Sequence, residues 1–105
     1  AELGRNSAKI AELIDGDGNL LMLNVLDKQY SSAELLEIVN SARTQQKLGR
    51  RSSRTFISTT LKKVIELGLF KPLYPNTPHH PRQKYLVTES GMAYQKVLIS
   101  EKGTD

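Results

Sequence analysis

Cysteine is absent from this chain of 105 residues, and aromatic residues make up only 6% of it. The absence of thiols excludes disulfides, thiolate zinc sites and cysteine nucleophiles. No apolar run approaches the roughly 20 residues that cross a bilayer, and residues 1–6 carry no basic flank leading into an apolar signal segment. We therefore expect a cytoplasmic protein without membrane partners, folded as one domain and stabilised by packing.

Groups that typify catalytic centres are also scarce. The chain has no histidine-containing metal signature, no phosphate-binding glycine loop with its lysine and no paired acids in a plausible cleft. Residues 15–19 begin like a calcium loop, but Leu20 and Leu26 stand where its glycine and its bidentate glutamate belong. His79 and His80 lie beside prolines without a carboxylate at ligand spacing. We expect no enzyme activity, no metal and no cofactor.

Positive charge is concentrated in one stretch. Residues 43–84 contain ten lysines and arginines against a single acid, Glu66, so the stretch carries +9. The whole chain is +4, which leaves −5 for the remainder. A block of one sign creates a field that attracts polyanions, and nucleic acid is therefore the first candidate partner.

The spacing of apolar residues predicts three helices in the first half. A first short helix over 7–14 ends at the breaker cluster 15–18, and the apolar run 20–26 favours a buried second helix. Ser31 and Glu34 form a capping-box pattern that starts a third helix. Its polar end is expected to run through Arg43–Lys47 until Gly49 stops the helix.

A fourth helix is predicted over 52–68, capped by Ser52 or Ser53. One side is apolar and is expected to pack on the core through Ile57, Leu61, Val64, Ile65 and Gly68. The opposite side has hydroxyl groups on its first turns and ammonium groups further along: Ser52, Thr55, Thr59, Lys62 and Lys63. Such a helix can read one surface while it packs on another.

Two strands and a last helix complete the prediction. Leu69–Tyr74 and Gln83–Val87 read as a hairpin whose tip is stiffened by three prolines, with its tyrosines packed beneath it. Thr88 caps a helix over 88–100, in which Gly91 is tolerated. Residues available there for packing or dimer contact are Met92, Val97, Leu98 and Ile99.

Two segments carry a resemblance to a known family. The stretch 55–70 resembles the recognition helix of winged helix-turn-helix regulators of the MarR and PadR type, and 85–91 is similar to the exit from their wing. The two matches together cover 52–98. The polar segment 41–51 departs from the tight turn that usually precedes the recognition helix.

The resemblance implies a fold that is mainly α with a small β-hairpin, an α+β winged helix-turn-helix in a single domain, 1–105. Its parts would be N-terminal helices (1–28), a second helix (31–48), a recognition helix (52–68), a wing hairpin (69–87) and a C-terminal helix (88–100). It also implies that the recognition helix enters the major groove while the wing lies on the backbone or minor groove.

The residue types fit such a division of labour. Hydroxyl groups near the helix start suit base edges, an arginine there suits guanine, and the two helix lysines suit phosphates. The expected DNA contacts are Arg50, Arg51, Ser52, Ser53, Arg54, Thr55, Ser58, Thr59, Lys62, Lys63, His79, His80, Arg82 and Lys84.

The expected function is sequence-specific binding of double-stranded DNA, as a homodimeric transcriptional regulator or a plasmid-type partition factor associated with the nucleoid. The alternative is a winged-helix protein-interaction module in a replication, transcription or segregation assembly, where the basic face meets an acidic partner. The fold permits both.

Overall fold

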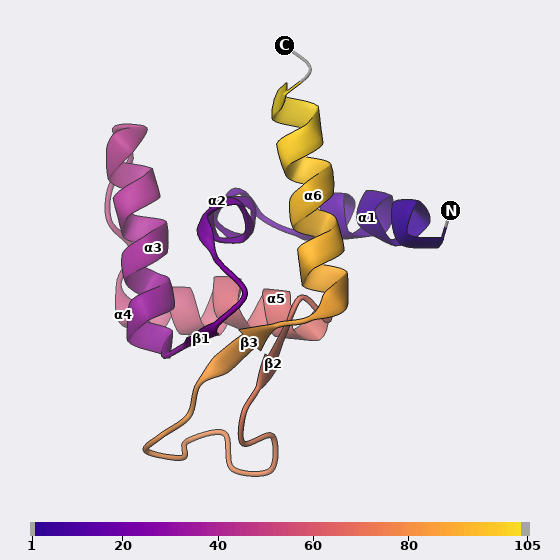
Figure 1. The fold of residues 1–105 in the computed structure, drawn as a ribbon. Coiled ribbons are helices and arrows are strands. Elements are labelled where there is room, and N and C mark those ends of the chain that lie inside the picture. Colours follow the sequence, from indigo (N-terminus) through magenta and orange to yellow (C-terminus); the bar gives the residue numbers. More distant parts are fainter. Residues whose placement is uncertain (1, 104–105) are drawn as a thin grey trace.

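The computed structural model describes residues 2–103, with side chains placed for 8–100. The chain is mainly helical with a small antiparallel sheet, so the predicted α+β class is confirmed (Figure 1). In order, the elements are α1 (Glu2–Leu13), α2 (Gly16–Asn24), β1 (Gln29–Tyr30), α3 (Ser32–Gln45), α4 (Ser53–Phe56), η1 (Ile57–Leu61), α5 (Lys62–Glu66), β2 (Phe70–Pro72), β3 (Tyr85–Val87) and α6 (Glu89–Gly103).

The sheet has three strands in the order β1-β3-β2, all antiparallel. Tyr85 of β3 pairs with Tyr30 on one side and with Pro72 on the other. The β2–β3 hairpin was predicted, although its strands are shorter than expected. Strand β1 was missed because two residues are too few to show an alternating pattern. The sheet therefore ties the α2–α3 connection to the hairpin.

The first two helices meet at the predicted breaker cluster. Asp15 caps α2, and its Oδ1 accepts a hydrogen bond of 2.7 Å from the amide of Gly18. The cluster therefore starts a helix within itself instead of forming a separate turn. The predicted buried helix over 20–26 is confirmed in type, with Leu21 and Met22 fully buried, but it begins earlier and ends at Asn24.

The predicted capping box opens α3. The hydroxyl of Ser31 accepts from the amide of Glu34 at 3.2 Å, and the Glu34 carboxylate accepts from the amide of Ser31 at 2.9 Å. The hydrogen bond from the Ser31 amide to the carboxylate is the main cause that lowers the pKa of Glu34 from its ordinary value of 4.5. The start of α3 was thus readable from four residues.

The expectation that Gly49 stops α3 is wrong. The helix ends at Gln45, and the left-handed residue behind it is Lys47, with φ 62°. The amide of Lys47 donates to the carbonyl of Thr44 at 3.0 Å and that of the next residue to Arg43 at 2.8 Å, the paired bonds of a Schellman motif. A lysine fills a position that usually favours glycine.

Elements α4, η1 and α5 form one continuous helix, referred to below as helix 53–66, whose centre is wound as a π-helix. The amide of Lys62 donates to the carbonyl of Ile57, five residues back. The wider turn brings Phe56 and Leu61, also five residues apart, into the core at 1% and 2% exposure. The prediction that Ile57 packs on the core is wrong, since 45% of it is exposed.

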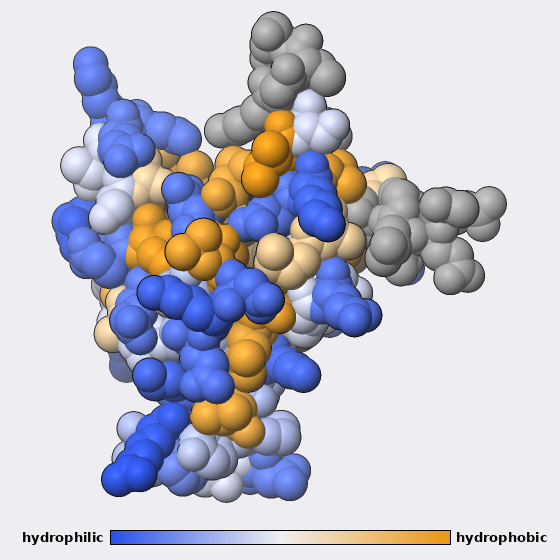
Figure 2. Space-filling view, in the orientation of Figure 1, coloured by the Kyte–Doolittle hydropathy of each residue, from blue (hydrophilic) through white to orange (hydrophobic). Residues whose placement is uncertain are grey.

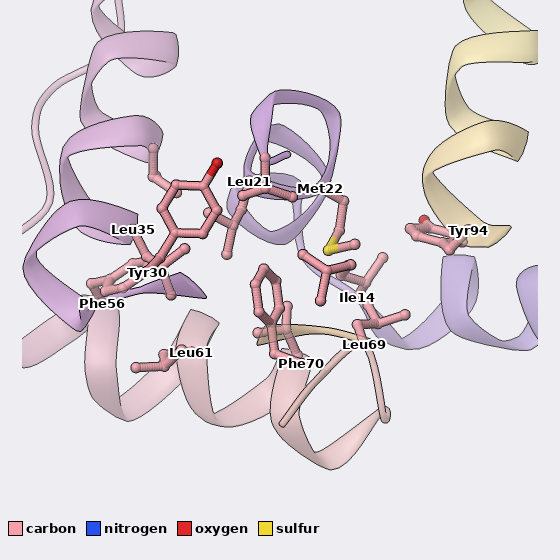
Figure 3. Packing of buried hydrophobic residues seen from close by; sticks show 14 of the residues in the cluster. Ile14, Leu21, Met22, Tyr30, Leu35, Phe56, Leu61, Leu69, Phe70 and Tyr94 are labelled. Atoms are coloured by element: carbon pink, nitrogen blue, oxygen red, sulfur yellow. The ribbon is translucent and has the colours of Figure 1, made fainter. Parts of the chain in front are cut away.

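The core lies where α2, α3, helix 53–66, the hairpin and α6 converge (Figure 3). Tyr94 of α6 is 1% exposed, and its hydroxyl donates to Asn19 at 2.6 Å. Gly91 is required and not merely tolerated, because a Cβ there would stand 2.3 Å from the backbone oxygen of Leu69. Close contact between α6 and the hairpin base therefore depends on the missing side chain.

Helix 53–66 and the hairpin lie at one end of the molecule, and α3 and α6 extend from them toward the other (Figure 1). The hairpin end is largely hydrophilic on the face shown in Figure 2, apart from a narrow apolar strip. No helix in the described part of the chain is long and apolar enough to span a bilayer.

Candidate nucleic-acid interface

Helix 53–66 presents one side to solvent. Phe56, Thr60, Leu61 and Val64 are buried and fix the other side to the core. The predicted site residues on the exposed side are Ser52, Ser53, Arg54, Thr55, Ser58, Thr59 and Lys62, all exposed, and Lys63, which is half-buried. The structure therefore brings eight of the fourteen predicted contacts onto the exposed side of one helix and its cap.

The hydroxyl groups on this helix are already engaged with its backbone. Ser52 caps the helix by accepting from the amide of Thr55 at 3.2 Å. Thr59 and Ser58 both donate to the carbonyl of Thr55, at 2.6 Å and 3.3 Å. Such back-bonding competes with the regular helical hydrogen bonds and accompanies the change to π winding that follows. These oxygens keep free lone pairs and so present acceptors to solvent.

The hairpin tip is ordered by side chains as well as by its prolines. Gln83 accepts from the amide of Tyr74 at 2.9 Å and donates to the carbonyl of Tyr74 at 2.9 Å, as a strand would. The rings of Tyr74 and His80 stack with centroids 3.8 Å apart and an angle of 11°. The predicted stiff tip therefore has a structural basis beyond its prolines.

The hairpin carries exposed cations on both arms. Lys71 lies on β2, and Arg82 and Lys84 precede β3, all three exposed. His79 is exposed, whereas His80 is half-buried and its Nδ1 accepts from the amide of Arg82 at 2.9 Å. Among the described residues, no three histidine or acidic groups are arranged to hold a metal ion.

The loop before helix 53–66 is held by a buried carboxylate that the sequence analysis did not single out. Asp17, 8% exposed, pairs with Arg43 at 2.5 Å and with Arg51 at 2.8 Å. Burial on its own would raise the pKa of Asp17, but the hydrogen bonds and charges of the two arginines outweigh it and lower that pKa below 3.8. Asp17 therefore stays ionised between two guanidinium groups.

A second buried group secures the backbone of the same loop. Asn40, 2% exposed, accepts from the amide of Arg51 at 2.7 Å and donates to its carbonyl at 3.1 Å. Arg43 also donates to the carbonyl of Gly49 at 2.5 Å. The loop at 46–52 is thus clamped to α2 and α3. This clamp sets where helix 53–66 begins.

The clamp engages some of the cations of the basic stretch 43–84. Three of its ten cations, Arg43, Arg50 and Arg51, form ion pairs, the second with Glu37 at 3.2 Å on the surface. Seven have no ion pair in the part of the chain that the structure describes: Lys47, Arg54, Lys62, Lys63, Lys71, Arg82 and Lys84. Six of these seven belong to helix 53–66 or the hairpin.

Asp17 and Asn40 could not have been chosen from the sequence. Asp17 stands in a glycine-rich cluster typical of a turn, and Asn40 is a single polar residue in a predicted helix. Their partners lie 34 and 11 residues away along the chain. Only the packing of α2 against α3 brings these groups together.

Comparison with known proteins found no matching family model, no matching curated protein and no matching solved structure. Any function must therefore be argued from the geometry of the chain.

Proposed function

We propose that this chain is a winged helix-turn-helix protein that binds double-stranded DNA. Helix 53–66 would be the recognition helix in the major groove, and the β2–β3 hairpin would be the wing on the backbone or minor groove. The observation that carries the proposal is the division of helix 53–66 into a buried apolar side and an exposed side of hydroxyl and cationic groups. A helix held in this way can enter a groove without rearranging.

Unpaired cations support this assignment. Lys62 and Lys63 lie toward the end of helix 53–66, and Lys71 and Lys84 lie on the hairpin that follows. The hairpin begins close to the end of the helix, and α5 contacts β2. Lysines at such positions suit phosphates on the two sides of a groove. The hairpin arginine, Arg82, suits a phosphate or the minor groove.

Arg54 is the better candidate for reading guanine. Its side chain is exposed and forms no hydrogen bond or ion pair with any residue that the structure describes. Arg51, the other candidate, has its Nε held by Asp17 at 2.8 Å. An unengaged guanidinium near the start of a recognition helix can make the bidentate contact that selects guanine.

We further propose that two copies bind a two-fold DNA site, as a transcriptional regulator or partition factor associated with the nucleoid. One small module makes few contacts, and two-fold sites double them. Leu13 at the end of α1 and Ile99 on α6 are 49% and 53% exposed and offer apolar surface outside the proposed DNA face. Sedimentation with and without duplex measures the stoichiometry, and one copy per site would contradict this part.

The test is titration of the protein with duplex DNA across a range of salt concentrations. The logarithm of the association constant should fall linearly with the logarithm of salt, with a slope of about −0.9 per phosphate contact. Selection from a random duplex pool should enrich a defined sequence. Changing Arg54 and Thr59 to alanine should remove the preference for that sequence and leave binding to random duplex measurable.

The matched control changes Lys9 and Lys96 to alanine, since both lysines are exposed and lie on α1 and α6. That variant should bind the enriched and random duplexes as the unchanged protein does. Feeble binding of the folded, unchanged protein to every duplex at moderate salt would contradict the proposal. It would favour the alternative, a module that binds an acidic protein.

A further inference from the structure

Ile57 is an apolar residue among the polar residues on the exposed side of helix 53–66. It is 45% exposed, although its neighbours on the exposed side are charged or hydroxyl-bearing. Residues three apart are neighbours on a helix surface, so Ile57 lies next to Arg54 along one edge of that side. The apolar side chain therefore borders the group that we assign to guanine.

The exposure of Ile57 follows from the π winding of the helix. Without the extra residue, regular α-helical spacing would place Ile57 on the same side as Leu61 and Val64. The wide turn buries Phe56 with Leu61 instead and leaves Ile57 in solvent. π-helical turns of this kind are frequent at functional sites.

The hydroxyl groups beside Ile57 limit what this part of the helix can donate. Ser58 and Thr59 both donate to the carbonyl of Thr55, so their protons are committed within the helix. The contact that remains open to Ile57 is apolar. In the major groove, the distinctive apolar group on a base edge is the C5-methyl of thymine.

We propose that Ile57 packs against the C5-methyl group of a thymine in the major groove. It thereby selects an A·T pair beside the base that Arg54 reads. This inference rests on the proposed function and assigns it a specificity-determining residue. The cations on the same helix, Lys62 and Lys63, hold the duplex close enough for a methyl contact.

The test replaces single thymidines by deoxyuridine in a duplex that the protein enriches from a random pool. This change removes only the methyl group. At one position in each half-site we expect affinity for the unchanged protein to fall roughly three- to fivefold, the effect of one buried methyl. Ile57→Ala should bind the thymidine and deoxyuridine duplexes equally, and Ile57→Val should retain part of the difference.

The matched control is Leu26→Ala, because Leu26 is an exposed apolar residue that lies between α2 and β1. It should lose affinity on deoxyuridine as the unchanged protein does. If every deoxyuridine duplex weakens Ile57→Ala and the unchanged protein alike, or weakens neither, Ile57 does not read the methyl. Salt-dependent duplex binding would still support the proposed function in that case. If no duplex binds at all, both proposals fall.

Discussion

The loop at 46–52 and helix 53–66 use their cations in opposite ways. Arg51, in the loop, is drawn into the structure by Asp17, together with Arg43 at the end of α3. Arg54 and Lys62, on the helix, are exposed and have no ion pair among the described residues. The two regions are continuous in sequence, and each contains three lysines or arginines. A run of positive charge therefore contains both structural and available cations.

Distance from a buried carboxylate makes the difference. A buried charge has to be paired, so Asp17 recruits the guanidinium groups that the packing of α2 against α3 brings within reach. The one carboxylate on helix 53–66 is that of Glu66 near its end, and it is exposed. The cations of this helix therefore have no ion pair among the described residues.

Removing the buried carboxylate of Asp17 should have the largest effect on stability. Asp17→Ala leaves Arg43, whose side chain is 12% exposed, without its counter-charge. We expect the free energy of unfolding to fall by about 3–5 kcal/mol, as when one partner of a buried ion pair is lost. Denaturant unfolding followed by circular dichroism measures the change.

Asp27→Ala serves as the matched control, because Asp27 is exposed and forms no ion pair within the described residues. It should alter the unfolding free energy by less than about 0.5 kcal/mol. Equal stability of the two variants would mean that the loop is not held by Asp17.

The available cations should affect binding and leave stability unchanged. We expect Lys62→Ala with Lys63→Ala to weaken enriched and random duplexes alike, and to make the salt slope shallower by about two. Thermal unfolding should be close to that of the unchanged protein, because neither lysine is in an ion pair. An unchanged slope would show that these lysines do not touch phosphates.

Lowering the pH should also distinguish the loop, which Asp17 holds, from helix 53–66. The pKa of Asp17 is lower in the folded chain than its ordinary value of 3.8, so the unfolded chain takes up the proton first as the pH falls. The stability from Asp17 is complete above about pH 5 and is lost as the pH falls through the folded pKa, by at most about 1.4 kcal/mol per pH unit. Asp17→Asn should flatten this part of the pH profile. If the profile keeps its slope, other carboxylates are responsible.

The fold was predictable where local signals decide it. The capping box at Ser31 and the proline-rich tip each combine a sequence pattern with a local hydrogen bond or a fixed φ angle. The cluster 15–18 was interpreted as a turn, whereas it caps and begins α2. Strand β1 was not predictable, because its pairing partner lies more than fifty residues away. The π turn was not either, since regular spacing put Ile57 on the core side.

The same distinction between local and long-range signals holds for the candidate site. The exposed side of helix 53–66 follows from helical periodicity, which sequence analysis can use directly. The pairing of Arg51 with Asp17 depends on how two helices pack, and periodicity does not report that. The sequence therefore identified the charged segment, whereas only the structure separated the paired cations from the free ones.

The surface ion pair between Arg50 and Glu37 is intermediate between the arginines paired with Asp17 and the unpaired cations of helix 53–66. Its side chains are 59% and 65% exposed, so breaking it should change stability by less than about 0.5 kcal/mol. A phosphate can compete more readily for this arginine than for Arg43, whose side chain is 12% exposed beside Asp17. We expect Glu37→Gln to tighten duplex binding by roughly twofold at low salt and to have no effect at high salt, because screening removes the competition. Adding Arg50→Ala should abolish the gain. A gain that survives this second change would come from the loss of negative charge near the DNA, and Arg50 would then belong with the structural cations.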